Sequence, residues 1–192
     1  MPSRRASFAL FAAAVSLLAA CGTQLTTAPS ATRANTSRAG AAHATATLQD
    51  AAGAEVGTAR FTEDATGRVH VTVQVRGVAP GRHGLHLHAV GVCDGSGAFA
   101  SAAGHYNPGA RQHGHHNPQG HHAGDLPNVE VNTAGNGHLT ATLEQFSLAE
   151  LADANGTALV LHQNEDDQTT NTGPLGPGNS GPRIACGVVA AR

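Results

Sequence analysis

Valine occupies every second position from Val69 to Val75, and polar residues fill the positions between them. Successive side chains of a β-strand point to opposite faces of its sheet, so this alternation predicts a strand with one buried and one solvated face. A single strand cannot cover its apolar face or satisfy its backbone polar groups alone. The pattern therefore requires further strands elsewhere in the chain.

Seven other short segments alternate in the same way or form brief apolar runs between turn residues. They predict strands near residues 44–49, 56–61, 84–90, 129–132, 138–143, 157–162 and 184–189. The chain holds 24 Gly and 9 Pro but only 3% aromatic residues, which disfavours a bundle of long helices. One short helix is predicted at 147–151, where Ser147 and Glu150 have capping-box spacing. We expect an all-β fold, an antiparallel sandwich or barrel of about eight strands.

Two long stretches, 91–127 and 163–183, show no such period. Loops of this length in a compact domain are usually functional or disordered. Nine of the 13 histidines fall between His83 and His122, largely within the first stretch. Because the histidines and the second cysteine, Cys93, lie in these regions, we interpret both loops as functional.

The first twenty residues have the order of a secretory signal. Arg4 and Arg5 precede an apolar run over 8–20, which is too short to span a membrane as a stable helix. The run ends in LAACG, which resembles a bacterial lipoprotein cleavage site, where the chain is cut before the cysteine and the thiol carries a diacylglycerol. The alternative is an ordinary secretion signal that is cut nearby, with Cys21 incidental.

The cysteine count favours lipidation of Cys21. Three cysteines in an exported chain would leave an odd thiol, whereas lipidation leaves Cys93 and Cys186 as one pair in an oxidising compartment. We therefore expect three regions: a signal peptide over 1–20, a lipidated cysteine with a flexible tether over 21–42, and an ordered β domain over 43–192. The chain would be exported to the bacterial cell envelope and held at a membrane by its lipid.

His86 and His88 occupy alternate positions of the segment GLHLH. On a strand both imidazoles would point to one face, with Leu85 and Leu87 on the other, and a neutral imidazole is a good ligand for copper or zinc. By itself this spacing is weak evidence, because paired histidines also occur on solvated strand faces. A metal site must gather further ligands from elsewhere in the chain.

Further motifs follow in a fixed order: GHYNP, QHG, HAGDLPN, LVLHQNEDD and GPRIACGVV. Together with GLHLH, this order resembles the copper–zinc superoxide dismutases over residues 84–189, with a weaker likeness over the earlier strands. His113 lies eight residues after His105, His122 lies nine residues further on, and Asp125 follows three later, as in that family. The resemblance implies an eight-stranded Greek-key fold with two long functional loops.

The resemblance also implies two metal ions that share one histidine. Copper would be held by His86, His88, His105 and His162. Zinc would be held by His105, His113, His122 and Asp125. Ligation by imidazoles alone suits copper, which changes oxidation state, whereas three nitrogens and one carboxylate suit tetrahedral, redox-silent zinc. The shared ring, that of His105, would bridge the two ions.

Further roles are implied around the metals. Asp166 falls where the family has a carboxylate that bonds one copper ligand and one zinc ligand, which would fix both rings. Arg183 matches an arginine that holds a small anion beside the copper. Cys93 and Cys186 match a disulfide between the first long loop and the last strand. The implied reaction converts two superoxide anions and two protons into dioxygen and hydrogen peroxide, with His105 leaving the copper and taking a proton on reduction.

Three histidines beside the proposed ligands have no role in this scheme: His115, His116 and His121. They are either solvated loop residues or capture metal before its delivery. Because they are close by, the choice of His113 and His122 as ligands depends on the family's spacing. The alternative function is a non-catalytic envelope protein that binds copper or zinc on the same fold. A purely adhesive lipoprotein would leave the ordered histidines unexplained.

Charge restricts the expected partners. The 11 basic residues are all Arg, they are balanced by 13 acidic residues, and the sequence lacks the clustered basic pattern of a nucleic-acid-binding protein. The expected small partner is the superoxide anion. Within 163–183 the only cation is Arg183, so we expect Arg183 and the metals to provide most of the electrostatic steering. The sequence does not give an oligomeric state.

Overall fold

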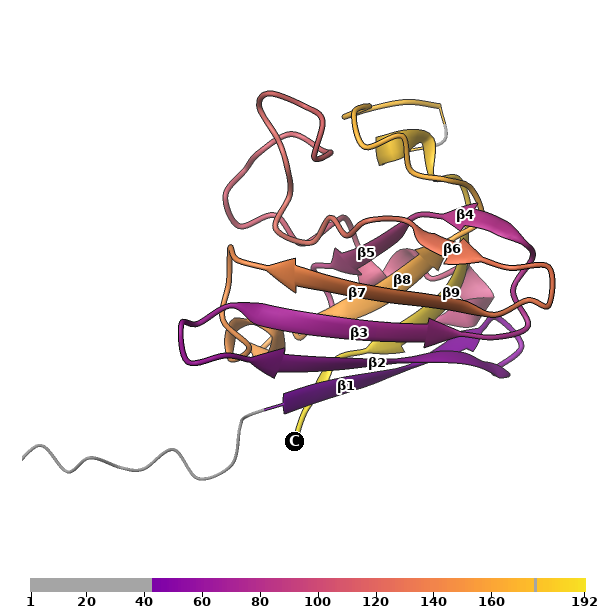
Figure 1. Ribbon diagram of the computed structural model, residues 1–192, viewed down its shortest axis with the longest axis horizontal. Coiled ribbons are helices and arrows are strands. Elements are labelled where there is room, and N and C mark those ends of the chain that lie inside the picture. Colours follow the sequence, from indigo (N-terminus) through magenta and orange to yellow (C-terminus); the bar gives the residue numbers. More distant parts are fainter. Residues whose placement is uncertain (1–42, 175) are drawn as a thin grey trace, which may run out of the picture. The chain divides into compact units, whose positions relative to one another are not determined.

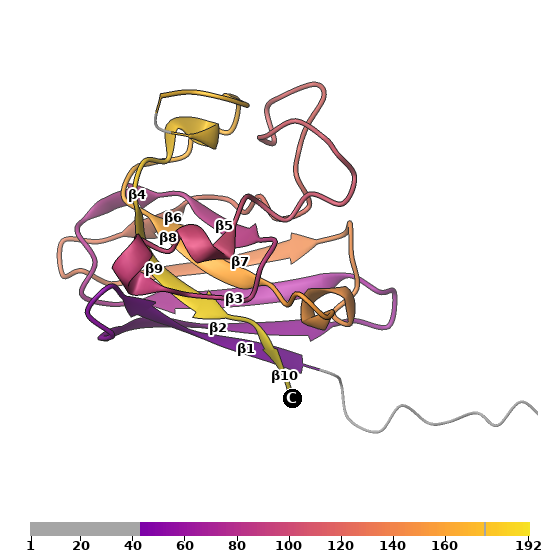
Figure 2. The ribbon, with the colours of Figure 1, turned by 180° about the vertical axis from the view of Figure 1, so that it is seen from behind.

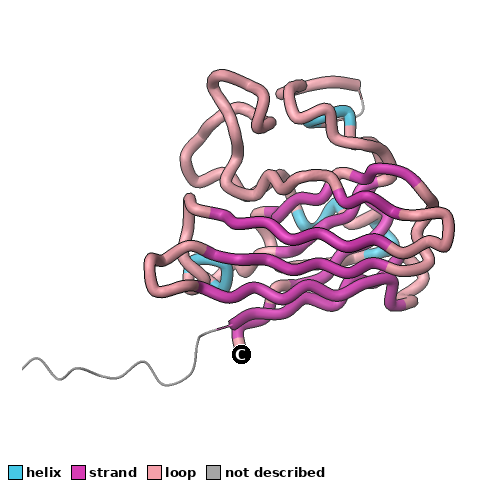
Figure 3. The backbone as a smooth tube through the Cα atoms, viewed as in Figure 1, coloured by secondary structure: helices cyan, strands magenta, loops and turns pink. Residues whose placement is uncertain are grey.

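The computed structural model describes residues 43–174 and 176–192, so the predicted signal peptide, Cys21 and the tether lie outside the described residues. These residues fold as antiparallel strands joined by turns and loops (Figures 1 and 3). The strands are β1 (His43–Asp50), β2 (Glu55–Glu63), β3 (Val69–Val75), β4 (Gly81–His83), β5 (Leu85–His88), β6 (Val129–Val131), β7 (Gly137–Leu143), β8 (Ala158–His162), β9 (Arg183–Val188) and β10 (Ala190–Ala191).

The strands form one sheet in the order β4-β6-β7-β3-β2-β1-β9-β8-β5, and β10 pairs with β1. Every pairing between these strands is antiparallel. The sheet curls into a nearly closed barrel, because β5, β8 and β9 lie behind the layer of β1, β2, β3 and β7 (Figures 1 and 2). The predicted all-β, antiparallel fold is confirmed.

Each of the eight predicted segments contains a strand, and the structure adds two short ones, β4 and β10. The strand predicted at 84–90 is shorter, since β5 spans only Leu85–His88, and Gly84 separates it from β4. β4 pairs with β6 at one edge of the open sheet, whereas β5 pairs with β8 at the other edge. A Cβ atom at Gly84 would lie 2.9 Å from the Ser180 Oγ, so the chain passes between the two edges at a point with no room for a side chain.

The helix predicted at 147–151 is wrong in extent and type. A single 3-10 turn, η3 (Glu150–Ala152), occupies this place. The backbone N–H and the hydroxyl of Ser147 both donate to the Glu150 carboxylate, at 2.7 and 2.8 Å. Among the described residues, no backbone N–H donates to the Ser147 hydroxyl, so only the Glu150 half of the capping box is formed.

The other helical elements are also single 3-10 turns: η1 (Gly95–Gly97), η2 (Ala100–Ala102) and η4 (Pro177–Asn179). In the described ranges, no helix has the length and apolar character needed to cross a membrane.

Alternate residues of facing strands fill the barrel interior. β3 contributes the four valines of the predicted pattern: Val69, Val71, Val73 and Val75. The opposite layer contributes fully buried leucines: Leu85, Leu87, Leu159 and Leu161. The alternation in the sequence therefore marks the core face of each strand correctly.

A smaller apolar cluster covers the other face of β8, where Val160 alternates with the two core leucines. Phe99 and Ala102 from the long loop after β5 pack there against Val160 and Cys186. Cys186 is joined to Cys93 by a disulfide, with 5.6 Å between the Cα atoms. The two cysteines are 93 residues apart, and a closed loop of that size stabilises a fold by about 4–5 kcal/mol in the chain-entropy model.

Candidate metal centre

β5 supplies the first two residues of the centre. Its alternation places the two leucines in the core and His86 and His88 on the opposite face, as predicted. The long loop after β5 runs along the edge of this strand, where backbone bridges join His86 to Asp125 and His88 to His105, and both imidazoles are buried. The loop thus adds further side chains to the centre and buries the imidazoles of β5.

β8 and the loop that follows it complete the centre. His162 is the last residue of β8, the neighbour of β5 in the sheet, and its backbone N–H donates to the Gly84 carbonyl at 2.9 Å. Asp166 follows four residues later in the second long loop. Both long loops extend from the same side of the sheet (Figures 1 and 2). Asp166 contacts the first loop, because one of its carboxylate oxygens lies 3.0 Å from the His113 Nε2.

Two groups of potential metal ligands result. The first, whose ligand atoms all lie within 4.8 Å of one another, consists of His86, His88, His105 and His162. The second, within the same distance, consists of His86, His105, His113 and Asp125. His122 lies beside the second group, with its Nδ1 3.2 Å from both the His105 Nδ1 and the Asp125 Oδ1. The side chains of all seven ligands implied by the resemblance therefore lie close together, and both His86 and His105 belong to both groups.

The donor atoms fit copper and zinc. Four buried imidazole nitrogens have no hydrogen-bond partner among the described residues: His86 Nδ1, His88 Nε2, His113 Nδ1 and His162 Nε2. The His113 Nδ1 lies 3.0 Å from the Asp125 Oδ2, but not in a hydrogen-bonding direction. An unpaired buried polar atom costs about 1–3 kcal/mol. Because imidazole nitrogens with a carboxylate are ligands of copper and zinc, a bound ion is the natural partner for these atoms.

The opposite nitrogen of each of these rings meets an acceptor. His88 Nδ1 donates to the Ala103 carbonyl at 2.8 Å, and His162 Nδ1 donates to the Gly181 carbonyl at 3.0 Å. A carbonyl oxygen can only accept, so the proton of each neutral ring lies on that nitrogen. The other nitrogen then presents its lone pair to the first group, as in rings that bind a metal.

Asp166 connects the two groups. Its carboxylate oxygens accept from the His86 Nε2 at 2.6 Å and from the His113 Nε2 at 3.0 Å. Asn128 fixes its backbone through two hydrogen bonds of 2.8 Å. Gly178, at a φ of +65°, lies so close that an added Cβ would be 2.1 Å from the Asp166 Oδ1. Asp166 thus occupies the position between the groups that the resemblance implies.

Burial and charge divide the histidines into two kinds. Burial lowers the pKa values of His86, His88 and His105, and it lowers the pKa of His162 to about 4. Burial also opposes protonation of His113, but contacts with the carboxylates of Asp125 and Asp166 outweigh it and raise that pKa to about 9. The first group is therefore a set of neutral imidazoles, whereas the carboxylates around His113 favour positive charge in the second group.

Arg183 is fixed beside the first group. Its Nη1 donates to the Phe99 carbonyl at 2.5 Å and its Nη2 to the Ala103 carbonyl at 2.6 Å. The Ala103 carbonyl is also the acceptor of the His88 Nδ1. After burial and His105, the charge of Arg183 is a further cause of the lowered pKa of His88. The guanidinium therefore lies close to the imidazoles of the first group.

The remaining loop histidines lie outside both groups. His115 and His121 pack against each other, with 3.8 Å between ring centroids. His116 is exposed, and its backbone N–H donates to the Gln168 carbonyl. His83 is buried, and one of its ring nitrogens lies 3.0 Å from the carbonyl of His162, so it holds the end of β8.

The sequence analysis missed the groups that orient the ligands. The Ala103 and Gly181 carbonyls belong to the backbone, which has no signature in the sequence. Asn128 lies in the quoted motif HAGDLPN, but its role depends on the meeting of two loops that are distant in sequence. The one available signal was its place directly before a predicted strand.

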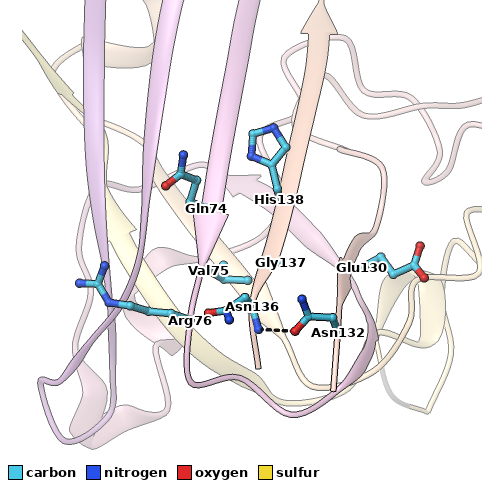
Figure 4. A pocket seen from close by; sticks show the side chains of 8 residues that line it. All are labelled: Gln74, Val75, Arg76, Glu130, Asn132, Asn136, Gly137 and His138. Carbon is cyan, nitrogen blue, oxygen red and sulfur yellow. Dashed lines mark hydrogen bonds between the residues drawn. The ribbon is translucent and has the colours of Figure 1, made fainter. Parts of the chain in front are cut away.

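A surface hollow of about 640 Å³ lies at the ends of β3, β6 and β7 (Figure 4). Its lining includes Gln74, Glu130 and His138, and the Asn136 N–H donates to the Asn132 side chain at 3.1 Å. None of its lining residues belongs to the two ligand groups. The candidate centre is instead the buried set of imidazoles under the long loops.

The fold is an antiparallel barrel whose two long loops cover two adjacent groups of potential metal ligands. This combination is that of a metal-binding β-barrel protein. The family described as copper/zinc superoxide dismutase matches residues 55–189, and the chain belongs to that family. A solved SOD-like protein from Bacillus subtilis is 34% identical, and the match covers 75% of this chain and 96% of that one, with a TM-score of 0.66. The Cu/Zn superoxide dismutase from Brucella abortus is 32% identical. That match covers 76% of this chain and 98% of the other, with a TM-score of 0.61. The resemblance seen in the sequence is confirmed.

The bridging role of Asp166 predicts a loss of metal affinity in Asp166→Asn. An amide cannot accept from both rings, so one ring loses its anchor, and we expect about 10- to 100-fold weaker binding of copper and zinc. Competition against a chelator of known affinity measures this. The matched control is Glu165→Gln, which removes the neighbouring, exposed carboxylate that pairs with Arg82. Equal affinities in the two variants would contradict the role of Asp166.

Proposed function

We propose that this chain is a copper- and zinc-dependent enzyme that converts superoxide to dioxygen and hydrogen peroxide. The observation that carries the proposal is the set of four buried, unpaired imidazole nitrogens. The proposed copper ligands are His86, His88, His105 and His162. The proposed zinc ligands are His105, His113, His122 and Asp125. Membership of the copper/zinc superoxide dismutase family supports this choice of ions.

Bound copper would supply one-electron redox chemistry, and bound zinc would supply a fixed positive charge. His105 has the position for the proton step. Its Nδ1 faces Asp125 and His122, at 2.9 and 3.2 Å, so its Nε2 is the atom left for the first group. We assign to the His105 Nε2 the holding and release of a proton, while the contacts at Nδ1 keep the ring in place.

Arg183 is proposed to hold the substrate anion. Two backbone carbonyls fix its guanidinium beside His88, and it remains partly accessible. A guanidinium stays charged at any physiological pH, so it can attract a small anion without changing state. In the described part of 163–183 it is the only cationic side chain, because the remaining charges are Glu165, Asp166 and Asp167.

A second function remains a candidate because of one comparison. The similar protein from Bacillus subtilis is described only as SOD-like, and this description does not state that it is a catalyst. A non-catalytic chain would bind copper and zinc at the same residues. The two functions differ in whether the loaded protein removes superoxide.

The decisive measurement is superoxide decay with protein loaded with copper and zinc. We expect decay in proportion to bound copper, and loss of that activity in His88→Gln because a ring of the first group is missing. His138→Gln is the matched control, since His138 is exposed on β7. A folded, copper-loaded wild-type protein without activity would overturn the enzyme and leave the binding protein.

The proposed role of Arg183 predicts a change in salt dependence. We expect the rate constant to fall with ionic strength in the wild type, because charge steers the anion, and to fall about tenfold or more in Arg183→Ala with a flatter salt profile. Arg183→Lys, which keeps the charge, should retain part of the salt dependence. A steep fall with salt that is undiminished in Arg183→Ala would refute this role.

We also propose that the chain is exported and held at a membrane of the bacterial envelope through Cys21. The Cys93–Cys186 disulfide supports an oxidising compartment. In Cys21→Ser we expect the protein to move from the membrane fraction to the soluble fraction, because the acyl chains are lost. Fractionation of cells that express each form measures this, and an unchanged membrane share would contradict the anchor.

A further inference from the structure

We propose that His115 and His121 form a third metal site, separate from the two buried groups, for a divalent d-block ion and above all for copper(II). We call these two residues the outer histidine pair. Neither residue belongs to the ligand groups described above.

The outer histidine pair is close together and open to solvent. Its ring centroids are 3.8 Å apart with an interplanar angle of 39°. His115 is exposed and His121 is partly exposed. Both line a surface hollow of about 310 Å³, which Glu144 and Gln145 also line. Two imidazoles at this spacing can reach one ion, since metal–nitrogen bonds are about 2.0–2.1 Å long.

Hydrogen bonds to carbonyl oxygens leave one unprotonated nitrogen on each ring. His115 Nε2 lies 3.0 Å from the carbonyl oxygen of Asp125, so this nitrogen donates and carries the proton. His115 Nδ1 is then unprotonated, and it has no hydrogen-bond partner among the residues that the structure describes. This is the arrangement of a metal-binding histidine, whose second nitrogen donates to a carbonyl or carboxylate.

His121 shows the same arrangement with the nitrogens exchanged. Its Nδ1 lies 2.8 Å from the carbonyl oxygen of His122 and therefore donates. The Nε2 then carries the lone pair. The Gln145 side-chain nitrogen lies 3.2 Å from both ring nitrogens, so it can donate only to the Nε2. Rotation of this amide would present its oxygen to an ion in the same place.

The donor set selects the class of ion. Two neutral imidazoles favour copper, zinc or nickel over magnesium or calcium, and copper(II) binds most tightly in the general order of divalent metals. The Glu144 carboxylate lines the same hollow and can balance part of the charge. Because the pair offers two nitrogens rather than four and remains open to water, its ion will exchange more readily than the ions of the buried groups.

The location gives the pair a connection to the second group. The His115 ring is hydrogen-bonded to the backbone carbonyl of Asp125, whose carboxylate lies in the second group. His121 directly precedes His122, which lies beside that group. An ion on the pair would therefore lie at the outer side of the buried centre, where it can be taken up from solvent.

The test is a copper(II) titration of protein whose buried groups are already filled with copper and zinc, followed by calorimetry and by the copper EPR signal. We expect wild type to bind one more equivalent than His121→Gln, with nitrogen couplings in the EPR signal of that equivalent. The difference in bound copper between wild type and His121→Gln tests the outer histidine pair. This test depends neither on the activity of the loaded protein nor on the number of ions in the buried groups.

His116→Gln is the matched control, because His116 is an exposed neighbour outside the pair, and it should bind as wild type does. His115→Gln should also bind one equivalent of copper less than wild type. If loss of the hydrogen bond to the Asp125 carbonyl unfolds this variant, His121→Gln alone provides the test. Equal stoichiometry in wild type and His121→Gln would overturn the proposal. An equal loss in His116→Gln would also overturn it, since this would show unspecific binding to surface histidines.

Discussion

The arrangement of the centre depends on one buried carboxylate. The side chain of Asp166 has no exposure to solvent, and a buried anion is costly unless it is paired and hydrogen-bonded. It accepts from the rings of His86 and His113 and from the Gln168 N–H at 2.6 Å. These donors come from β5, from the first long loop and from the second long loop. The carboxylate is therefore satisfied only when both loops are folded over the strand.

The unpaired nitrogens add a second constraint. Opposite faces of β5 bury leucines in the barrel core and imidazoles under the loops, so one strand serves two environments. Each buried nitrogen without a partner costs about 1–3 kcal/mol, and the loops hold four of them in place. An ion that pairs these nitrogens binds the folded chain more tightly than the unfolded one, so the difference in binding free energy adds to the stability of the fold.

The sequence predicts strands that show a periodic pattern and sites whose chemistry belongs to side chains. Alternation and short apolar runs located eight of the ten described strands, but β4 has three residues and β10 two, too few to show a period. Capping-box spacing suggested a helix at Ser147, yet the same two side chains bond to each other and leave a single 3-10 turn. The order and spacing of the family's motifs predicted His113, rather than His115, as a zinc ligand. Burial separates them in the structure, since His113 is fully buried and His115 is exposed.

The proposed anion-binding residue, Arg183, and the two groups of potential ligands are held by different parts of the fold. Arg183 takes its orientation from the carbonyls of Phe99 and Ala103, and Phe99 packs in the small cluster with Cys186. The disulfide fixes this loop to β9, the strand on which Arg183 lies. Asp166, by contrast, orients two imidazoles without contact to the disulfide. A change in the disulfide therefore acts first on the guanidinium, and a change in the carboxylate acts first on the ligands.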